Sequence, residues 1–232
     1  MSVVVLALSA WTGVLAADRT DVTAEVVPTS APDLAGAEPR EQAPSAPTTP
    51  TSEPAPAKAH VAEIPLQGDG KFDTEASSGR RAGSGNLLTY EVGVEGGVPV
   101  DASEFAAEVE RTLSDPRGWT SRGWAFQRAR AAGTRILLAT PATTDRLCAP
   151  LQTRGEVSCR NGDLVVINAV RWTRGATSYS GDVARYRQYL INHEVGHRLG
   201  RGHETCAAPG AKAPVMAQQT KGLQGCTLNP WP

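Results

Sequence analysis

The sequence predicts one small domain of the α/β (α+β) class behind a long N-terminal extension. Strand-like and helix-like patterns alternate downstream of residue 85, and the last part of the chain follows neither pattern. The length of the chain also favours one domain, because 232 residues suffice for one ordinary domain with appendages but are short for two. We therefore expect a single domain over residues 85–232, with residues 1–84 outside it.

The chain begins with its one long apolar run, Val3–Ala17. Its 15 residues match the apolar region of a signal peptide, whereas a transmembrane helix needs about 20 residues. No Lys or Arg precedes the run, so a signal anchor at the end of a longer reading frame is the alternative. We expect residues 1–17 to be a signal peptide or a signal anchor. The protein would then be extracellular, or attached to the cell-surface membrane through residues 3–17.

Residues 18–84 are expected to form a disordered linker rich in Pro, Ala and Thr. Eight of the 17 prolines lie between Pro28 and Pro56, and Asp18–Ala59 contains no aromatic residue. Such a segment buries too little apolar surface to offset the entropy of ordering it. Within this segment, Lys71–Asp73 is where a first edge strand is expected.

The first elements of the domain are a strand and a helix. Leu87–Val94 has the branched and aromatic residues of a strand. Asp101 then opens a helix, with Glu104 three residues later in capping-box spacing, and the helix ends before Pro116. The apolar face of this helix recurs at the helical period and consists of Phe105, Ala106, Val109 and Leu113.

Two further strands are expected at Trp124–Phe126 and Thr134–Thr140, joined through a turn at Gly133. Asp163–Trp172 is the strongest predicted strand, and its central apolar run places it inside a sheet. A second, longer helix is expected from about Asp182 to Leu199.

The charge pattern excludes some classes of protein. The net charge is -1, with more acidic than basic side chains upstream of residue 85 and the reverse downstream. The arginines are scattered, whereas nucleic-acid binding requires clustered basic residues. Only one stretch could enter a membrane, so a polytopic membrane protein is excluded. We expect a monomer whose partner is a peptide or protein substrate and not a nucleic acid.

The domain contains four cysteines, and an even number in an exported chain indicates two disulfides. Three pairings are open. The pairs Cys148–Cys159 and Cys206–Cys226 are preferred, because they close the shortest loops. A cysteine metal site is disfavoured, because no C-x-x-C spacing occurs. Free buried thiols are the remaining alternative, and they would be expected if the protein were cytosolic.

The end of the second predicted helix carries the motif HEVGHRLGRGH. Residues four apart lie on one face of a helix, so His193 and His197 can direct ring nitrogens at one ion. Gly200 permits the left-handed backbone that ends a helix, after which the chain turns back to bring in His203. Three neutral imidazoles and a water make the open tetrahedral site of a catalytic Zn2+. Glu194 lies about 100° around the helix from His193, so it can reach the water beside the ion.

The motif resembles the signature of the metzincin zinc peptidases, with Met216 of Ala213–Met216 standing at their Met-turn. The resemblance extends over Leu87–Pro232. The ending PVMAQQTKGLQGCTLNPWP is similar to that of a family of exported actinobacterial proteins with an uncharacterised metzincin-like domain. The resemblance implies a twisted mixed sheet, two main helices and a short irregular C-terminal part. It also implies that Met216 forms a hydrophobic floor beneath the three imidazoles; ordinary core filling is the alternative role.

The chain departs from the metzincin pattern after the Met-turn. Some metzincins carry a tyrosine just after this methionine, whereas Ala217, Gln218 and Gln219 follow it here. We therefore expect no fifth metal ligand from this loop. Few residues follow His203, so the lower wall of the cleft is expected to be short.

Together these features predict an exported zinc-dependent endopeptidase, a hydrolase in which Glu194 takes a proton from the zinc-bound water. Two alternatives are kept. One is a zinc amidase that acts on cell-wall peptides. Export and a long linker agree with this alternative equally well. The other is a non-catalytic binding module stabilised by zinc. Glu194 argues against that module, because a purely structural site needs no base.

Overall fold

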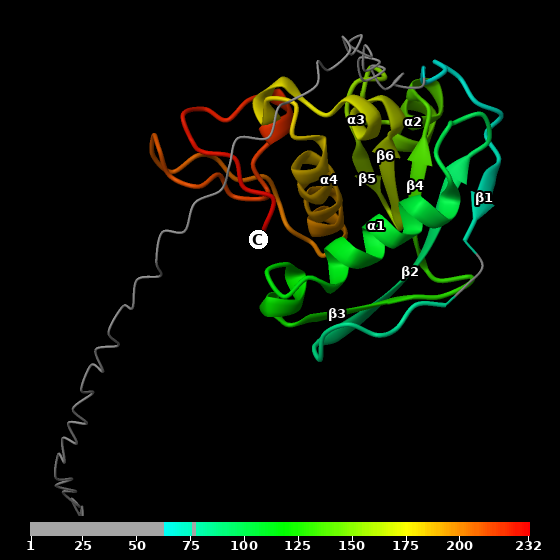
Figure 1. Ribbon diagram of the computed structural model, residues 1–232, viewed down its shortest axis with the longest axis horizontal. Helices are drawn as coiled ribbons and strands as arrows, with labels where there is room; N and C mark the ends of the chain where they lie inside the picture. The colour runs from blue at the N-terminus through cyan, green and yellow to red at the C-terminus, as the bar shows by residue number, and fades with distance from the viewer. Residues whose placement is uncertain (1–62, 76–77) are drawn as a thin grey trace, which may run out of the picture. The chain divides into compact units, whose positions relative to one another are not determined.

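The computed structural model describes residues 63–75 and 78–232, which form an α/β domain (Figure 1). The predicted signal segment, residues 1–17, lies outside the described residues, as does the predicted linker up to residue 62. The α/β (α+β) class predicted from the sequence is confirmed, with a mixed sheet and an irregular C-terminal part.

Six strands of the described chain form one mixed sheet in the order β1–β2–β4–β6–β5, and β3 pairs with β2 off this path. β2, β4 and β6 run parallel, and β3 runs parallel to β2. β1 and β5, at the two ends of the order, run antiparallel to their neighbours. The strands span Phe72–Thr74 (β1), Asn86–Glu95 (β2), Trp124–Arg128 (β3), Thr134–Ala139 (β4), Cys159–Asn161 (β5) and Leu164–Asn168 (β6).

Four helices accompany the sheet in the described residues: α1 (Ala102–Ser114), α2 (Pro141–Cys148), α3 (Ala169–Arg174) and α4 (Val183–Arg198). α1 and α4 confirm the two main helices that the sequence predicts. Each begins beside an aspartate whose carboxylate accepts hydrogen bonds from backbone N–H groups of the first turn, Asp101 for α1 and Asp182 for α4. α2 and α3 are short additions that the sequence pattern did not predict.

The predicted strand Asp163–Trp172 is wrong in its second half. β6 ends at Asn168 and α3 begins at Ala169. The Asn168 side-chain oxygen accepts hydrogen bonds from the N–H groups of Val170 (3.0 Å) and Arg171 (3.4 Å). This N-cap starts a helix in a run whose β-branched residues favour a strand.

The sheet separates two hydrophobic cores. α1 and α4 pack on one face, where they bury alternate residues of the central strands. α2 packs on the other face over a smaller core. The strand residues of the larger core include Ile136, Leu138, Val165 and Ile167. The smaller core consists of Ala139, Cys148, Cys159 and Val166.

The domain extends upstream of residue 85, the boundary that the sequence predicts. β1 confirms the expected edge strand near Lys71–Asp73 and pairs with the end of β2. Ile64 is buried in the larger core. The buried Glu95 carboxylate accepts hydrogen bonds from the N–H groups of Gly70 (2.9 Å) and Thr140 (2.7 Å), which holds the upstream segment against β2. Part of the predicted linker therefore belongs to the domain.

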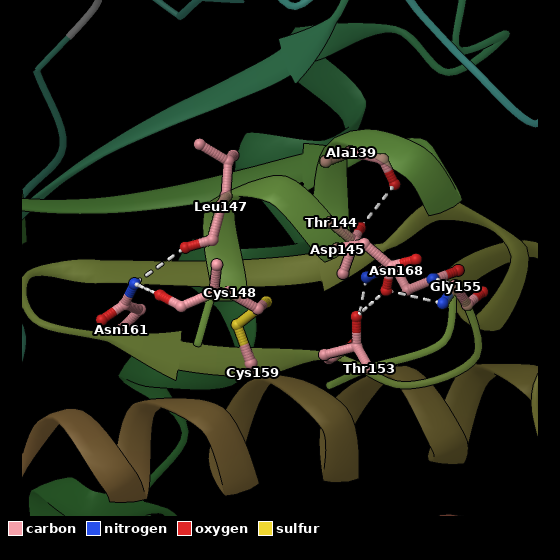
Figure 2. Close-up of a disulfide and its surroundings, with 12 residues drawn as sticks. Ala139, Thr144, Asp145, Leu147, Cys148, Thr153, Gly155, Cys159, Asn161 and Asn168 are labelled. Atoms are coloured by element: carbon pink, nitrogen blue, oxygen red, sulfur yellow. Dashed lines mark hydrogen bonds between the residues drawn. A yellow bond between two sulfur atoms is a disulfide. The ribbon is translucent and has the colours of Figure 1, made fainter. Parts of the chain in front are cut away.

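Both predicted disulfides are present, Cys148–Cys159 and Cys206–Cys226. The first joins the end of α2 to the start of β5 (Figure 2), and the second ties the segment after His203 to the C-terminal segment. Disulfides persist in oxidising compartments, so the pair favours an extracellular environment. Across residues 63–75 and 78–232, no helix is both long and apolar enough to cross a bilayer.

Candidate metal centre

The structure brings the three predicted histidines together at the end of α4. One ring nitrogen from each of His193, His197 and His203 lies within 4.8 Å of the others. The Nε2 atoms of His197 and His203 are 3.1 Å apart. Nitrogens about 2.0–2.1 Å from one tetrahedral zinc ion are separated by roughly 3.3 Å. The three side chains can therefore hold one metal ion, as predicted.

The turn that ends α4 positions the second and third histidines. Gly200 adopts the predicted left-handed conformation, with φ +82°. The Gly200 N–H donates to the His197 carbonyl (3.1 Å) and the Arg201 N–H to the Gly196 carbonyl (2.9 Å), the two bonds of a Schellman motif. The same reversal brings the Arg201 carbonyl to the His197 ring, whose Nδ1–H donates to it at 2.8 Å. The chain then continues to His203.

Hydrogen bonds to backbone carbonyls orient two of the imidazoles. His193 Nδ1–H donates to the Val215 carbonyl at 2.8 Å, just as His197 donates to Arg201. A neutral imidazole that donates through Nδ1 keeps its lone pair on Nε2, where a metal binds. Burial lowers the pKa of His193 to about 3 and is also the first cause that lowers the pKa of His197 and His203. All three rings are therefore neutral at pH 7, as metal binding requires.

Met216 is buried and packs against the motif helix, where Gly196 leaves room for it. A methyl group at Gly196 would overlap the Met216 Sδ and lie 2.8 Å from Cζ2 of Trp119. The neighbouring Val215 carbonyl is the acceptor for His193. Met216 therefore fills the core, as one of its two predicted roles requires, and the residue before it orients a histidine; its role as a floor beneath the three imidazoles stays a prediction.

We expect Gly196→Ala to destabilise the protein by about 1–3 kcal/mol, the usual cost of overpacking a filled core. Trp119 cannot yield easily, because its indole N–H donates to the Asn192 carbonyl at 3.0 Å. Denaturant titration of both proteins measures the difference. Gly202→Ala is the matched control, since no described residue lies within 4 Å of a methyl group there, and it should change stability by less than about 0.5 kcal/mol. Equal stability of the two variants would contradict the proposed packing.

Glu194 lines the same pocket as the three histidines and is buried. Within the described residues its carboxylate has no hydrogen-bond donor and no ion pair. Burial raises its pKa to about 8 in the metal-free protein. Its oxygens are not among the fully buried polar atoms that lack a partner, so the carboxylate reaches the open space of the pocket. A nearby cation and a water would supply the missing partners and lower this pKa again.

The contribution of Glu194 to the stability of metal-free protein should therefore fall as the pH rises from 6.5 to 8. In this window the folded state keeps a proton on Glu194, whose folded pKa is about 8, while the unfolded state, with a pKa of 4.5, has released it. Stability falls wherever the folded state binds more protons, here by about 1–2 kcal/mol. Denaturation of chelator-treated protein at several pH values measures this. Glu194→Gln should remove this fall and leave the rise in stability that the histidines cause, because their folded pKa is lowered; an unchanged pH dependence in that variant would refute the assignment.

The pocket has two walls that the sequence did not reveal. β5, the strand at one end of the sheet order, contributes Cys159 and Arg160 to it. Tyr189 lines it from α4, and its hydroxyl donates to the Ala217 carbonyl at 3.0 Å. One sequence signal could have indicated Tyr189, because it stands one helical turn before His193. The position of β5 has no such local signal.

Comparisons with known proteins identify a family but not an activity. A family model described as "Protein of unknown function (DUF3152)" matches residues 59–232. The chain therefore belongs to this family, and the match, like the structure, begins upstream of residue 85. No curated protein and no solved structure matches the chain.

Proposed function

We propose that this member of the DUF3152 family is an exported zinc-dependent endopeptidase. One observation carries the proposal: three imidazoles converge in a pocket that also contains the Glu194 carboxylate, which has no hydrogen-bond or ion-pair partner among the described residues. Three imidazole nitrogens with room for a further ligand are the donor set of catalytic zinc. The resemblance of HEVGHRLGRGH to the metzincin signature points in the same direction. A zinc ion held there would polarise the scissile carbonyl and make water a better nucleophile.

The residues of the chain have separate roles in this proposal. His193, His197 and His203 hold the metal, and the Val215 and Arg201 carbonyls orient two of their rings. Glu194 accepts a proton from the attacking water and returns it to the leaving amine. Burial raises its pKa in the metal-free protein, and a cation bound by the histidines would lower it again, so that the carboxylate is ionised and can accept the proton.

β5 offers a place for an extended peptide beside the metal site. In the described part of the chain, β5 pairs with β6 alone, so its outer edge is open. A peptide that adds to such an edge is held by main-chain hydrogen bonds. The Cys148–Cys159 disulfide and the Asn161 side chain, which donates to the carbonyls of Leu147 (2.9 Å) and Ala149 (3.0 Å), anchor β5 to the end of α2 (Figure 2).

Digestion of a peptide library by zinc-loaded protein tests the proposal. Internal cleavage that stops on chelation and returns with zinc is the expected result. Cleavage of cell-wall peptide fragments alone would instead favour the amidase. Stoichiometric zinc without turnover of either substrate would favour the binding module.

Export itself is tested by locating the protein outside the producing cell, either free or held at the membrane through residues 3–17.

A further inference from the structure

The pocket around the three imidazoles contains two exposed cations that hydrolysis itself does not need. Arg160 lines the pocket from β5, and Lys221 lines it from the 3₁₀ turn Gln219–Lys221. Within the described residues neither side chain has an ion pair, although several other arginines do. Among the described residues that line this pocket, Glu194 is the only acid. The pocket walls therefore carry an excess of positive charge.

The strand register explains why Arg160 faces the site. Cys159 is opposite Val166, and Arg160 is opposite Val165. Cys159 and Val166 belong to the smaller core on the α2 face, whereas Val165 belongs to the larger core beneath α4. Because successive side chains of a strand point to opposite faces, Arg160 takes the α4 face, where the histidines lie.

Both cations are close enough to act on the metal-binding rings. Burial is the main cause that lowers the pKa of His197, and the positive charge of Arg160 lowers it further. Burial is also the main cause that lowers the pKa of His203. The neighbouring His197 and then the positive charge of Lys221 lower it further. The two positive charges therefore reach the site of reaction from different walls.

We propose that Arg160 and Lys221 select substrates that carry a carboxylate beside the scissile bond. This inference rests on the proposed function, because it names the substrate class of the same pocket. The planar guanidinium of Arg160 can bind a carboxylate through two parallel hydrogen bonds, and Lys221 adds a second positive charge. Ion pairs at exposed cations are weak individually, so we expect a preference of about tenfold for the anionic substrate.

Such a carboxylate has two sources in a peptide: an Asp or Glu side chain, or the free C-terminus. Peptides with Glu or Gln on either side of the cleaved bond, each made with a free or an amidated C-terminus, distinguish these sources. A Glu effect that survives amidation assigns the side chain. Loss of cleavage on amidation assigns the terminal carboxylate.

The first measurement is the ratio of kcat/KM for the preferred anionic peptide to that for its neutral counterpart. We expect a ratio of about ten in zinc-loaded protein, falling toward one in the double variant Arg160→Gln/Lys221→Gln. Arg174→Gln is the matched control: it removes an exposed cation that lies outside this pocket, so it should keep the wild-type ratio. An equal ratio in the double variant and the control would overturn the inference.

A second measurement does not depend on turnover. Binding of the same fluorescent peptides to zinc-loaded Glu194→Gln should be about tenfold tighter for the anionic peptide, and the difference should shrink as salt is raised. Preferential binding without hydrolysis by wild-type protein would refute the peptidase but keep this ligand class. Hydrolysis without any anionic preference would keep the peptidase and refute the role of the two cations.

Discussion

Glu194→Gln is expected to abolish peptide hydrolysis while the metal stays bound. The three imidazoles hold the ion, so the change removes the proposed base but no metal ligand. Loss of general acid–base catalysis costs about 10²- to 10⁴-fold in rate. Measuring kcat on the best library peptide, together with metal content by elemental analysis, tests both halves of the expectation.

Glu204→Gln is the matched control for that experiment. Glu204 is exposed, directly follows a metal-binding histidine and does not line the pocket of the three imidazoles. The same chemical change there should keep both zinc and turnover. If Glu194→Gln retained wild-type turnover, the general-base role would be wrong, even with the metal in place.

His203→Ala should lose the metal without losing the fold. His203 is exposed, so its removal leaves no cavity in the core. Removing a metal ligand should lower zinc affinity by more than the 10- to 100-fold typical for loss of a group that merely orients a ligand. Competition with a chromophoric chelator measures the affinity, and the circular dichroism of metal-free protein checks the fold.

His60→Ala controls for the loss of a histidine as such, since it is the one histidine outside the motif. It should bind zinc like wild type. If His203→Ala also bound zinc like wild type, only His193 and His197 would hold the ion, and the three-histidine site would be refuted.

Local signals explain which elements were predictable. The motif helix α4 begins just after Asp182, whose carboxylate caps its first turn, and ends before Gly200, whose left-handed backbone reverses the chain. Since the three histidines are spaced along this helix and the turn after it, their convergence could be predicted without knowledge of the remaining fold. The disulfides followed from short loop lengths in the same way.

Other parts depend on contacts between distant segments. The Val215 carbonyl lies 22 residues from His193, and no local pattern indicates that it accepts the Nδ1–H of that ring. β5 is only three residues long and is recognised by its pairing with β6. The predicted start of the domain at residue 85 was wrong for a similar reason. Ile64 lies in a largely polar stretch, yet it packs in the core of the domain.

The position of the metal tests the central claim most directly. Crystals of zinc-loaded protein, measured on either side of the zinc absorption edge, should show one anomalous peak about 2.0–2.1 Å from the Nε2 atoms of His193, His197 and His203, with the Glu194 carboxylate outside that ligand set. Crystals without a peak at these three rings, from protein that nevertheless hydrolyses peptides, would contradict it.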